Sequence, residues 1–556
     1  MERRESEFNL IFFKLALVFS FLILVFRLFQ LQVISGKRNR ELAEGNRTKI
    51  EILPALRGVI YDRQKRVLAR NVPVYKKCRI NNEQCTIIGR EEALRLEAEG
   101  KAGEVVTEIG REYPYGEILA HVIGYLGEAN EKEILNGKCK LKPSDLVGRT
   151  GVEAQYDCLL RGKDGGKIVE VDANGNKVKE IGEMQAVPGQ DLTLTLDASL
   201  QKAAYEALGD QKGAVVVTNP RTGEILALVS SPSFNPAIFE SCQAVRLPSC
   251  QAELEKILAD QNQPLFNRAI SGTYPPGSTF KIITAVAGLE EGKIDRNFKY
   301  DDPGVIVIGP YRFANWYYLS RGAKEGLISV VTAMQRSTDT FFYKVGEMVG
   351  LPSLAGWSKK FGLGQTLGID LPAESEGFVP DEAWKKRAKG ESWFLGNTYH
   401  LAIGQGDLLV TPLQVNSWTA AIANGGKLCQ PHLSDLGDLS NLCQDLGLKR
   451  ETVELVREGL RRACEPASEG RKAGTGWPFF DFKVPVGCKT GTAEFGDPQN
   501  RTHAWFTIFA PSYASDSEAS EGKPEIVVTV LVEGGGEGSN VAAPIAKKIL
   551  EEWFGH

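Results

Sequence analysis

The sequence predicts an α/β (α+β) protein with three parts: a membrane-spanning helix, a small β-rich domain, and a large domain in which helices flank an antiparallel sheet. Three observations predict this order. An apolar run of 24 residues lies close to the N-terminus. Runs that alternate apolar and polar residues, as half-buried strands do, recur as far as residue 189. Beyond residue 190, strand-like runs at both ends enclose helical patterns, which is typical of one sheet flanked by helices.

Length and composition indicate a folded protein. The chain has 556 residues, of which 42% are hydrophobic and 24% are charged, values close to those of ordinary globular domains. Its 66 basic and 70 acidic residues give a formal charge of −4. Since there is no long basic run, a nucleic-acid-binding protein that relies on phosphate contacts is disfavoured. The recurring apolar residues exclude disorder of the whole chain.

The apolar run Leu10–Val33 predicts a single transmembrane anchor. As a helix it would cover about 36 Å, which is enough to cross the hydrocarbon core of a bilayer. Lys14 and Arg27 lie toward its two ends, from where their long side chains can reach the headgroups. The alternatives are a cleaved signal peptide and a buried helix, but no small-x-small cleavage site follows the run. The charges on its two sides do not decide its orientation.

Ten cysteines indicate an oxidising compartment, because so many free thiols would be unusual in the cytosol. Cys78 and Cys85 are close enough in sequence to close a small loop, as are Cys242 and Cys250. The sequence leaves the rest of the pairing open. The other six are Cys139, Cys158, Cys429, Cys443, Cys464 and Cys488.

The β-rich domain is predicted to span residues 40–189, after an anchor segment of residues 1–36. The run Leu53–Asn71 alternates apolar and polar residues around a turn, which is typical of a hairpin. Lys167–Ile181 has the same pattern, with its turn at residues 174–176.

The large domain is predicted to span residues 190–556. Helices are expected at Ala198–Leu208 and Ala543–Phe554, where apolar residues recur with helical spacing. Because strand-like runs occur near both of these helices, one antiparallel sheet is expected to join the two ends of the domain. The runs are Asp191–Asp197, two within Gly213–Pro232, His503–Pro511 and Glu525–Glu533.

Ser278 and Lys281 are the leading candidates for a catalytic pair. A Pro-Pro-Gly turn delivers Ser278 to the start of an apolar helix and places Lys281 on the same face. The dipole at a helix N-terminus favours a developing oxyanion. A lysine whose pKa is lowered by burial and neighbouring cations can take up the serine proton. The structural alternative is that Ser278 only caps the helix and Lys281 is solvated.

The Ser-x-x-Lys pattern has little weight by itself. The chain contains three matches, and about two are expected by chance at ordinary composition. The match at Ser199 lies inside an amphipathic helical pattern, and the match at Ser520 lies in a polar loop. Only the match at Ser278 follows a tight turn and precedes a long apolar helix.

A second candidate site lies at the one Lys-Thr-Gly of the chain, Lys489–Gly491, which is followed by Thr492. In a strand, Thr490 and Thr492 would point to one face, and Lys489 and Gly491 to the other. A glycine in a strand lets a ligand or another backbone approach closely. The alternative is an ordinary edge strand.

The order of these motifs carries a family resemblance. Ser337-x-Asp339 lies between them, 59 residues after Ser278 and 152 residues before Lys489. With these spacings the chain resembles the penicillin-recognising serine enzymes, and among them the high-molecular-weight penicillin-binding proteins rather than small β-lactamases. The resemblance implies a serine transpeptidase domain that follows a pedestal domain of the dimerisation type.

The resemblance extends over nearly the whole chain from about residue 50. Arg57-Gly58 with Asp62-Arg63 is similar to an element of the class B pedestal, and too few residues precede the catalytic domain for the glycosyltransferase domain of class A. Ala120–Gly127 and His503–Pro511 resemble the elongation-type branch, penicillin-binding protein 2, more than the septal one. Further blocks similar to the family are Gly148–Gly165, Ala214–Pro236, Phe361–Pro380 and Ile403–Gln414.

The resemblance implies a D,D-transpeptidase that crosslinks peptidoglycan stem peptides and is acylated by β-lactams. Ser278 would attack the carbonyl between two terminal D-alanines, with Lys281 as the base. Ser337 would pass a proton to the leaving amine. Asp339 would orient Ser337 or Lys281. Lys489 would lower the pKa of Lys281 and attract the substrate carboxylate.

Thr490, Gly491 and Thr492 are the substrate-binding residues that the resemblance implies. The two threonine hydroxyls would bind the substrate carboxylate, and the backbone N–H groups of Ser278 and Thr492 would form the oxyanion hole. No cofactor is implied.

The chain departs from the family pattern at two positions. Asp339 stands where Asn is usual, although elongation-type relatives often carry Asp, and Glu494 stands where Gln is commoner. Some elongation enzymes hold zinc between the first two motifs. Because no His or Cys lies between Lys281 and Ser337, no metal site is expected there.

Anchor and pedestal suit an enzyme that acts on the cell wall. The resemblance implies a single-pass protein of the inner (cytoplasmic) membrane, with its short N-terminus in the cytoplasm and its catalytic domain on the periplasmic or extracytoplasmic side. The expected partners are peptidoglycan stem peptides, β-lactam antibiotics, a SEDS-type (RodA-like) membrane glycosyltransferase and other proteins of the elongation complex.

Other functions stay open at this point. Within the family, the alternative is a septal class B transpeptidase. A β-lactamase would need a base that activates water, and no Glu can be assigned to that role from the sequence. A β-lactam sensor would be expected to carry a larger N-terminal part. A scaffold with decayed motifs would have no activity.

Overall fold

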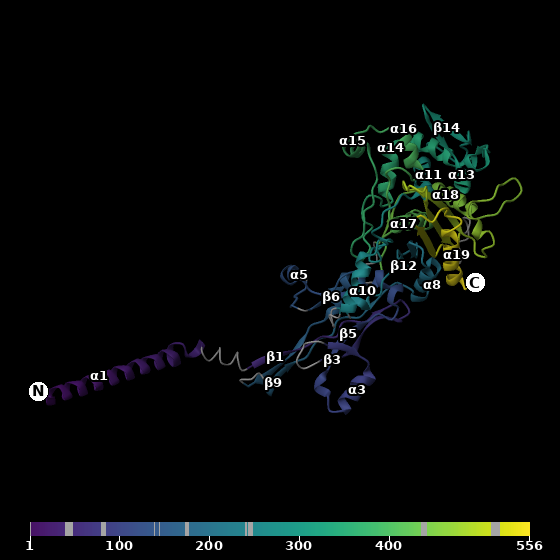
Figure 1. Ribbon diagram of the computed structural model, residues 1–556. Helices are drawn as coiled ribbons and strands as arrows, with labels where there is room; N and C mark the ends of the chain where they lie inside the picture. Colours follow the sequence, from purple (N-terminus) through teal and green to yellow (C-terminus); the bar gives the residue numbers. More distant parts are fainter. Residues whose placement is uncertain are drawn as a thin grey trace. The chain divides into compact units, whose positions relative to one another are not determined.

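The computed structural model (Figure 1) describes residues 2–38, 48–78, 85–137, 139–143, 145–172, 177–239, 242, 248–434, 442–512 and 523–555. The chain divides into two compact units. The first unit contains Met1–Gly58 and Arg161–Gln190. The second contains Val59–Leu160 and Asp191–His556.

The first unit begins with the long helix α1 (Glu2–Phe29), which continues as a π-helical turn, η1 (Gln30–Ile34). By length and composition the segment Asn9–Ile34 can cross a membrane, in agreement with the prediction for Leu10–Val33. The large apolar side chains of this segment are exposed. An apolar surface of this kind suits a helix that contacts lipid.

The rest of the first unit is a three-stranded antiparallel sheet. Strand β8 (Gly165–Val171) lies in the middle and pairs with β1 (Thr48–Leu53) and β9 (Lys177–Met184). Strands β8 and β9 form the hairpin predicted at Lys167–Ile181, whose turn at residues 174–176 lies outside the described part of the chain.

A five-stranded sheet occupies the N-terminal part of the second unit. Strands β2 (Ile60–Tyr61) and β3 (Val67–Cys78) form the hairpin predicted at Leu53–Asn71. The other strands are β4 (Cys85–Ile88), β5 (Val105–Glu112) and β10 (Leu192–Thr193). Shorter elements follow: α3 (Arg90–Ala98), η2 (Ala102–Glu104), η3 (Gly116–Ile118), α4 (Ala120–Ile123), β6 (Leu126–Glu128), α5 (Glu131–Asn136), β7 (Leu146–Gly148), α6 (Gly151–Gln155) and α7 (Asp157–Arg161).

The strand predicted at Asp191–Asp197 is much shorter in the structure, because only β10 (Leu192–Thr193) pairs as a strand. The backbone N–H groups that follow donate to unrelated partners: that of Thr195 to the carbonyl of Leu433, and that of Asp197 to the carbonyl of Leu226. A segment whose hydrogen bonds change partner at each step cannot continue a strand ladder.

The compact units divide the chain differently from the predicted domains 40–189 and 190–556, which stay a prediction. Within the second unit, Ile60, Leu68 and Val122 belong to one buried cluster with Val216 and Leu228. Residues between Ile60 and Leu160 therefore share a hydrophobic core with the large sheet that follows.

The large sheet has the strand order β12 (Ile225–Ser231), β11 (Gly213–Thr218), β21 (Ile526–Val532), β20 (Thr502–Ala510) and β19 (Gly487–Glu494). All its neighbours are antiparallel. Strands from the two ends of the predicted domain therefore meet at β11 and β21, which confirms the expected sheet for every run except Asp191–Asp197, whose short strand β10 pairs with β2 in the other sheet. Strand β19, which carries the Lys-Thr-Gly motif, lies at one edge.

Helices cover both faces of this sheet (Figure 1). Helices α8 (Ala198–Leu208) and α19 (Ala542–Phe554) pack against one face, and α17 (Pro412–Ala423) packs against the other. The alternation of side chains along β21 explains the two cores, because Val528 and Val530 belong to one cluster while Val527 and Leu531 belong to the other. Both predicted helices are confirmed.

The remaining elements are largely helical and include α11 (Lys281–Glu290), whose side chains are almost all buried in the same hydrophobic cluster as those of α17. The helices are α10 (Pro248–Ala259), η4 (Gly277–Phe280), α12 (Trp316–Arg321), α13 (Val330–Arg336), α14 (Asp339–Lys360), α15 (Glu382–Lys389), α16 (Leu395–Ala402), α18 (Arg450–Ala463) and η6 (Trp477–Phe479). The short strands are β13 (Tyr300–Asp301), β14 (Val305–Ile308), β15 (Tyr311–Ala314), β16 (Leu327–Ile328), β17 (Lys427–Cys429) and β18 (Cys443–Asp445).

All ten cysteines are paired in disulfides. The two pairs expected from sequence proximity are confirmed. The five bonds are Cys78–Cys85, Cys139–Cys158, Cys242–Cys250, Cys429–Cys443 and Cys464–Cys488. This pattern fits the predicted oxidising compartment.

Candidate active site

Ser278 lies in the 3₁₀ turn η4, directly before helix α11, as the Pro-Pro-Gly turn predicts. Gly277 adopts a φ of +53°, and a Cβ on it would lie 2.8 Å from the carbonyl oxygen of Thr492. Glycine is therefore required where the turn passes the strand. The Trp505 indole N–H donates to the carbonyl of Pro275 at 3.0 Å and ties the turn to β20.

The side chain of Ser278 is half-buried and lines a cleft of about 1490 Å³. Side chains from all three motifs line the same cleft. The motif residues are Ser278, Ser337, Asp339, Thr490 and Thr492, and Glu494 at the end of β19 lines the cleft with them.

Lys281 is fully buried, and its ammonium group has three oxygen partners. Lys281 Nζ lies 2.8 Å from the Ser337 carbonyl oxygen, 3.2 Å from Ser337 Oγ and 2.6 Å from Asp339 Oδ1. Burial lowers the pKa of Lys281, although the Asp339 carboxylate acts in the opposite direction. A solvated Lys281, the structural alternative, is therefore wrong.

Ser337 connects the two buried lysines. It caps the C-terminus of α13 with a φ of +56°, a left-handed conformation that is uncommon for a residue with a side chain. Its Oγ also accepts a hydrogen bond from Lys489 Nζ at 2.8 Å. Such backbone strain persists where the surrounding structure holds it, often at functional sites.

Lys489 is fully buried on β19 and donates to the Thr490 carbonyl at 2.9 Å as well as to Ser337. Burial together with the neighbouring Lys281 ammonium holds the pKa of Lys489 well below its ordinary value. Asp339 counteracts this effect.

Asp339 starts helix α14, where its negative charge suits the helix dipole. Its Oδ1 contacts Lys281, and its Oδ2 accepts the backbone N–H of Trp316 at 3.1 Å. Its side chain therefore contacts Lys281, one of the two residues that the sequence prediction left open as its target. Its contact with Ser337 passes through that lysine.

The strand alternation predicted for the Lys-Thr-Gly motif is confirmed. Thr490 is half-buried and Thr492 exposed, and both line the cleft, whereas Lys489 and Gly491 are buried. A Cβ on Gly491 would lie 2.8 Å from the Cβ of Trp505, so the glycine permits the close packing of β19 against β20.

The structure adds Thr475 and Trp316 to the residues of this site. Thr475 Oγ1 accepts a hydrogen bond from Thr490 Oγ1 at 3.0 Å, and Trp316 supplies the N–H for Asp339. Both lie in loops or at a helix start, where the sequence has no periodic signal. No sequence feature distinguishes Thr475 from the other threonines of the chain.

The other two Ser-x-x-Lys matches do not belong to this site. Ser199 Oγ accepts a hydrogen bond from the guanidinium of Arg66, and Lys202 forms an ion pair with Glu206 on α8. Ser520 lies outside the described residues.

Comparison with known proteins identifies both parts of the chain. The sequence profile of the penicillin-binding protein transpeptidase domain matches residues 213–551. The profile of the penicillin-binding protein dimerisation domain matches residues 88–194.

Curated relatives match over almost the full length. The peptidoglycan D,D-transpeptidase MrdA of Acinetobacter baumannii is 32% identical, over 98% of this chain and 87% of the relative. The peptidoglycan D,D-transpeptidase MrdA of Escherichia coli K12 is 30% identical, over 95% of this chain and 91% of the relative.

Solved structures also match over most of the chain. One is the penicillin-binding protein (PBP2) in complex with MreC from Helicobacter pylori, with a TM-score of 0.77 and 28% identity over 91% of this chain and 99% of that chain. Another is a chain from a peptidoglycan synthase complex, with a TM-score of 0.77 and 33% identity over 98% of both chains.

Proposed function

Because this chain belongs to the penicillin-binding protein transpeptidase family, we propose that it is an elongation-type peptidoglycan D,D-transpeptidase that acts through an acyl-enzyme on Ser278. The observation that carries the assignment of roles is the contact of both buried lysines with Ser337 Oγ, beside the cleft that Ser278 lines. The MrdA relatives favour elongation over the septal alternative.

The proposed base is Lys281 in its neutral form. The Asp339 carboxylate neutralises only one ammonium charge. Protonation of both buried lysines therefore leaves one buried charge unbalanced, which costs free energy and favours loss of a proton. A substrate carboxylate close to Lys489 favours the charged form of that lysine. The charge on Lys489 then makes it easier for Lys281 to lose its proton.

In the acylation step, Ser278 Oγ forms a bond to the carbonyl carbon between the two terminal D-alanines, and its proton passes to Lys281 Nζ. The backbone N–H groups of Ser278 and Thr492 stabilise the resulting oxyanion. The C–N bond breaks, and Ser337 relays a proton from the lysine pair to the departing D-alanine amine. The contacts of Ser337 with both lysines support this relay.

In the second step, a side-chain amine of a neighbouring stem peptide attacks the acyl ester and restores the Ser278 hydroxyl. The carboxylate of the donor peptide is held by Lys489 and by the hydroxyl of Thr492, and Thr490 lies beside it in the cleft with its own hydroxyl donating to Thr475. β-Lactams, whose carbonyl and carboxylate mimic the donor peptide, acylate the same serine.

Intact-mass spectrometry tests the nucleophile. The full chain in detergent is mixed with benzylpenicillin and followed over hours beside a Ser278→Ala variant. A long-lived adduct that is missing in the variant is expected. An unmodified wild-type protein would contradict the proposal, and an adduct that disappears while the drug is consumed would indicate a β-lactamase.

We further propose that α1 anchors the chain in the inner (cytoplasmic) membrane, with the disulfide-bonded remainder on the periplasmic side. Protease treatment of intact spheroplasts is expected to remove the chain beyond α1. Protection of the chain until the membrane is lysed would contradict this orientation.

A SEDS-type (RodA-like) glycosyltransferase is the proposed partner that supplies the polymer. The two profiles that match this chain are those of a transpeptidase domain and a dimerisation domain, and neither is a polymerising domain. Similar chains occur in a peptidoglycan synthase complex and in a complex with MreC. Site-specific photocrosslinking from α1 in living cells is expected to capture a multi-span membrane protein of this kind. Capture of lipid alone would contradict a contact through α1.

A further inference from the structure

We propose that Thr475 is a further substrate-binding residue of this site and that the Cys464–Cys488 disulfide holds it in place. The inference rests on the proposed transpeptidase function, because the ligand that Thr475 would bind is the carboxylate of the donor peptide. It concerns a loop between α18 and β19 that none of the three motifs includes.

Thr475 occupies the wall of the cleft beside the Lys-Thr-Gly strand. It is half-buried, it lines the cleft with Gly474 and Trp477, and its Oγ1 accepts the hydroxyl proton of Thr490 at 3.0 Å. The proton of Thr490 is thereby used within the protein. Because Thr475 Oγ1 accepts this bond, its own hydroxyl proton can be donated to a substrate group. A carboxylate, which only accepts hydrogen bonds, suits that donor.

The Cys464–Cys488 disulfide packs against the backbone next to Thr475, at Gly476. Cys488 directly precedes Lys489 on β19, Cys464 follows the last residue of α18, and both are buried. A Cβ on Gly476 would lie 2.5 Å from the sulfur of Cys488 and 2.7 Å from that of Cys464. The backbone next to Thr475 therefore rests directly on the disulfide.

Hydrogen bonds close the same loop onto the end of α18. The N–H of Gly476 donates to the Ala463 carbonyl at 2.7 Å, and that of Gly474 donates to the Glu465 carbonyl at 3.0 Å. With the disulfide, these bonds fix the height of the loop above β19.

A second attachment comes from α13, the helix that ends at Ser337. Arg336 Nη1 donates to the Ala473 carbonyl at 2.7 Å, and Gln335 Nε2 donates to the Lys472 carbonyl at 2.5 Å. The loop thus joins the helix that presents Ser337 to the strand that presents Lys489, and Thr475 is placed relative to both.

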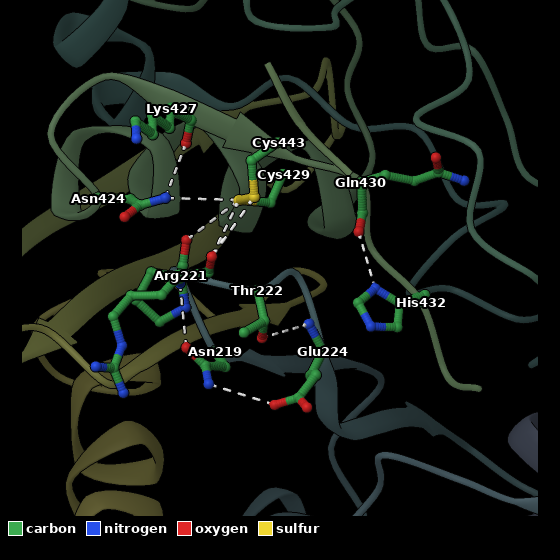
Figure 2. The surroundings of a disulfide bond; sticks show 11 residues. Asn219, Arg221, Thr222, Glu224, Asn424, Lys427, Cys429, Gln430, His432 and Cys443 are labelled. Atoms are coloured by element: carbon green, nitrogen blue, oxygen red, sulfur yellow. Dashed lines mark hydrogen bonds between the residues drawn. A yellow bond between two sulfur atoms is a disulfide. The ribbon is translucent and has the colours of Figure 1, made fainter. Parts of the chain in front are cut away.

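Figure 2 shows a disulfide of the same unit that serves as a control. Cys429–Cys443 joins β17 to β18, and its sulfur atoms lie near the backbone of Arg221 and the side chain of Asn424 (Figure 2). None of these residues lines the cleft. Loss of this bond should leave substrate binding unchanged.

Substitution of Thr475 tests the contact without touching the disulfide. The full chain in detergent is assayed for D-alanine release from a soluble peptide that ends in D-Ala-D-Ala and from the same peptide with a terminal amide. For Thr475→Val we expect the KM for the acid to rise about tenfold, as loss of a hydrogen bond to a charged group predicts, with little change in kcat. Thr475→Ser should restore the wild-type KM.

The preference for the acid over the amide decides the outcome. If Thr475→Val lowers kcat/KM equally for both peptides, or for neither, the carboxylate contact is wrong. A wild-type protein that neither releases D-alanine nor takes up benzylpenicillin would instead overturn the proposed function, so the two failures are distinguishable.

Paired serine substitutions test the disulfide. Cys464→Ser with Cys488→Ser is expected to raise the KM for the acid peptide as Thr475→Val does, whereas Cys429→Ser with Cys443→Ser is expected to leave it unchanged. If the disulfide acts through Thr475, adding Thr475→Val to the first pair should raise the KM no further. Additive effects, or an equal effect of the control pair, would overturn the positioning role.

Discussion

Lys281 and Lys489 contact one oxygen atom, Ser337 Oγ, at Nζ–Oγ distances of 3.2 Å and 2.8 Å. Both lysines are fully buried, and Asp339 is the carboxylate that contacts one of them. Burial and mutual repulsion therefore favour loss of a proton from the pair. A neutral lysine is the base that the proposed acylation of Ser278 needs, and Ser337 links it to the second lysine.

The pH dependence of acylation follows from this arrangement. Because burial lowers the pKa of Lys281 below its ordinary 10.5 and Asp339 raises it, Asp339→Asn should lower that pKa further. The rate of acylation by benzylpenicillin rises with pH as Lys281 loses its proton. In a plot of acylation rate against pH, the rising limb should move to lower pH in Asp339→Asn, by about one pH unit or more.

Stopped-flow acylation rates across the pH range provide the measurement. Asp381→Asn is the matched control, since Asp381 caps α15 and does not line the cleft. Its limb should coincide with that of the wild type. A limb that stays in place in Asp339→Asn, or moves to higher pH, would show that Asp339 does not control the base.

Ser337→Ala should slow acylation while the fold persists. Lys281 keeps the Ser337 carbonyl and Asp339, and Lys489 keeps the Thr490 carbonyl, so neither lysine loses all its partners. Loss of a proton relay of this kind costs about 10²–10⁴-fold in rate. The measurement is the rate of D-alanine release from a donor peptide.

Ser329→Ala serves as the control, because it should lower stability and leave acylation intact. Ser329 caps α13, the helix that ends at Ser337, through the backbone N–H of Thr332. Its loss should lower the free energy of unfolding by about 1 kcal/mol with acylation retained. Equal rates in both serine variants would be incompatible with the relay.

Gly277→Ala should impair the oxyanion hole. At a φ of +53°, the new Cβ would lie 2.8 Å from the Thr492 carbonyl oxygen and 3.2 Å from the Ala493 Cβ. Strand β19 and the Ser278 turn must then separate, which displaces two proposed N–H donors from each other. We expect acylation to slow by about 10²-fold or more.

Gly292→Ala is matched to this substitution, because Gly292 follows the other end of α11 with a φ of +63° and has no atom within 4 Å of a new Cβ. It should cost about 1–2 kcal/mol of stability and leave the acylation rate unchanged. A similar loss of acylation in both variants would mean that backbone strain alone, and not contact with Thr492, causes the effect.

Buried histidines should make the second unit sensitive to acid. Burial lowers the pKa of His121 from 6.5 to about 4, and that of His503 also to about 4. Between these values the unfolded chain binds protons that the folded chain does not. Stability is therefore lost as the pH falls from about 6.5 to about 4, by about 3 kcal/mol for each histidine, and levels off below.

The melting temperature as a function of pH measures this loss. His121→Phe keeps an aromatic ring against Phe234, its edge-on neighbour, and removes the titrating group. The decline in melting temperature should be shallower in this variant over the same pH interval. An unchanged decline would show that His121 does not titrate in the folded state as its burial requires.

Much of the fold could be predicted because its signals are local. Helix α8 has a clear helical periodicity, and strands β11, β12, β20 and β21 are continuous apolar runs; each occurs where the sequence places it. The segment Asp191–Asp197 looks equally strand-like but pairs at only two residues, because its hydrogen-bonding partners come from different parts of the chain. Propensity gives no information about which partners are available.

Chemistry and order of the motifs follow from the sequence alone: a serine after a tight turn at the start of an apolar helix, a Lys-Thr-Gly strand, and Ser337-x-Asp339 between them. Only the tertiary structure decided that Ser337 Oγ lies between two lysines that are 56 and 152 residues away in sequence. It also decided that Thr475 meets Thr490 and that Cys464 pairs with Cys488. These contacts depend on how helices and strands pack, and the burial that lowers both lysine pKa values exists only once the core has closed around them.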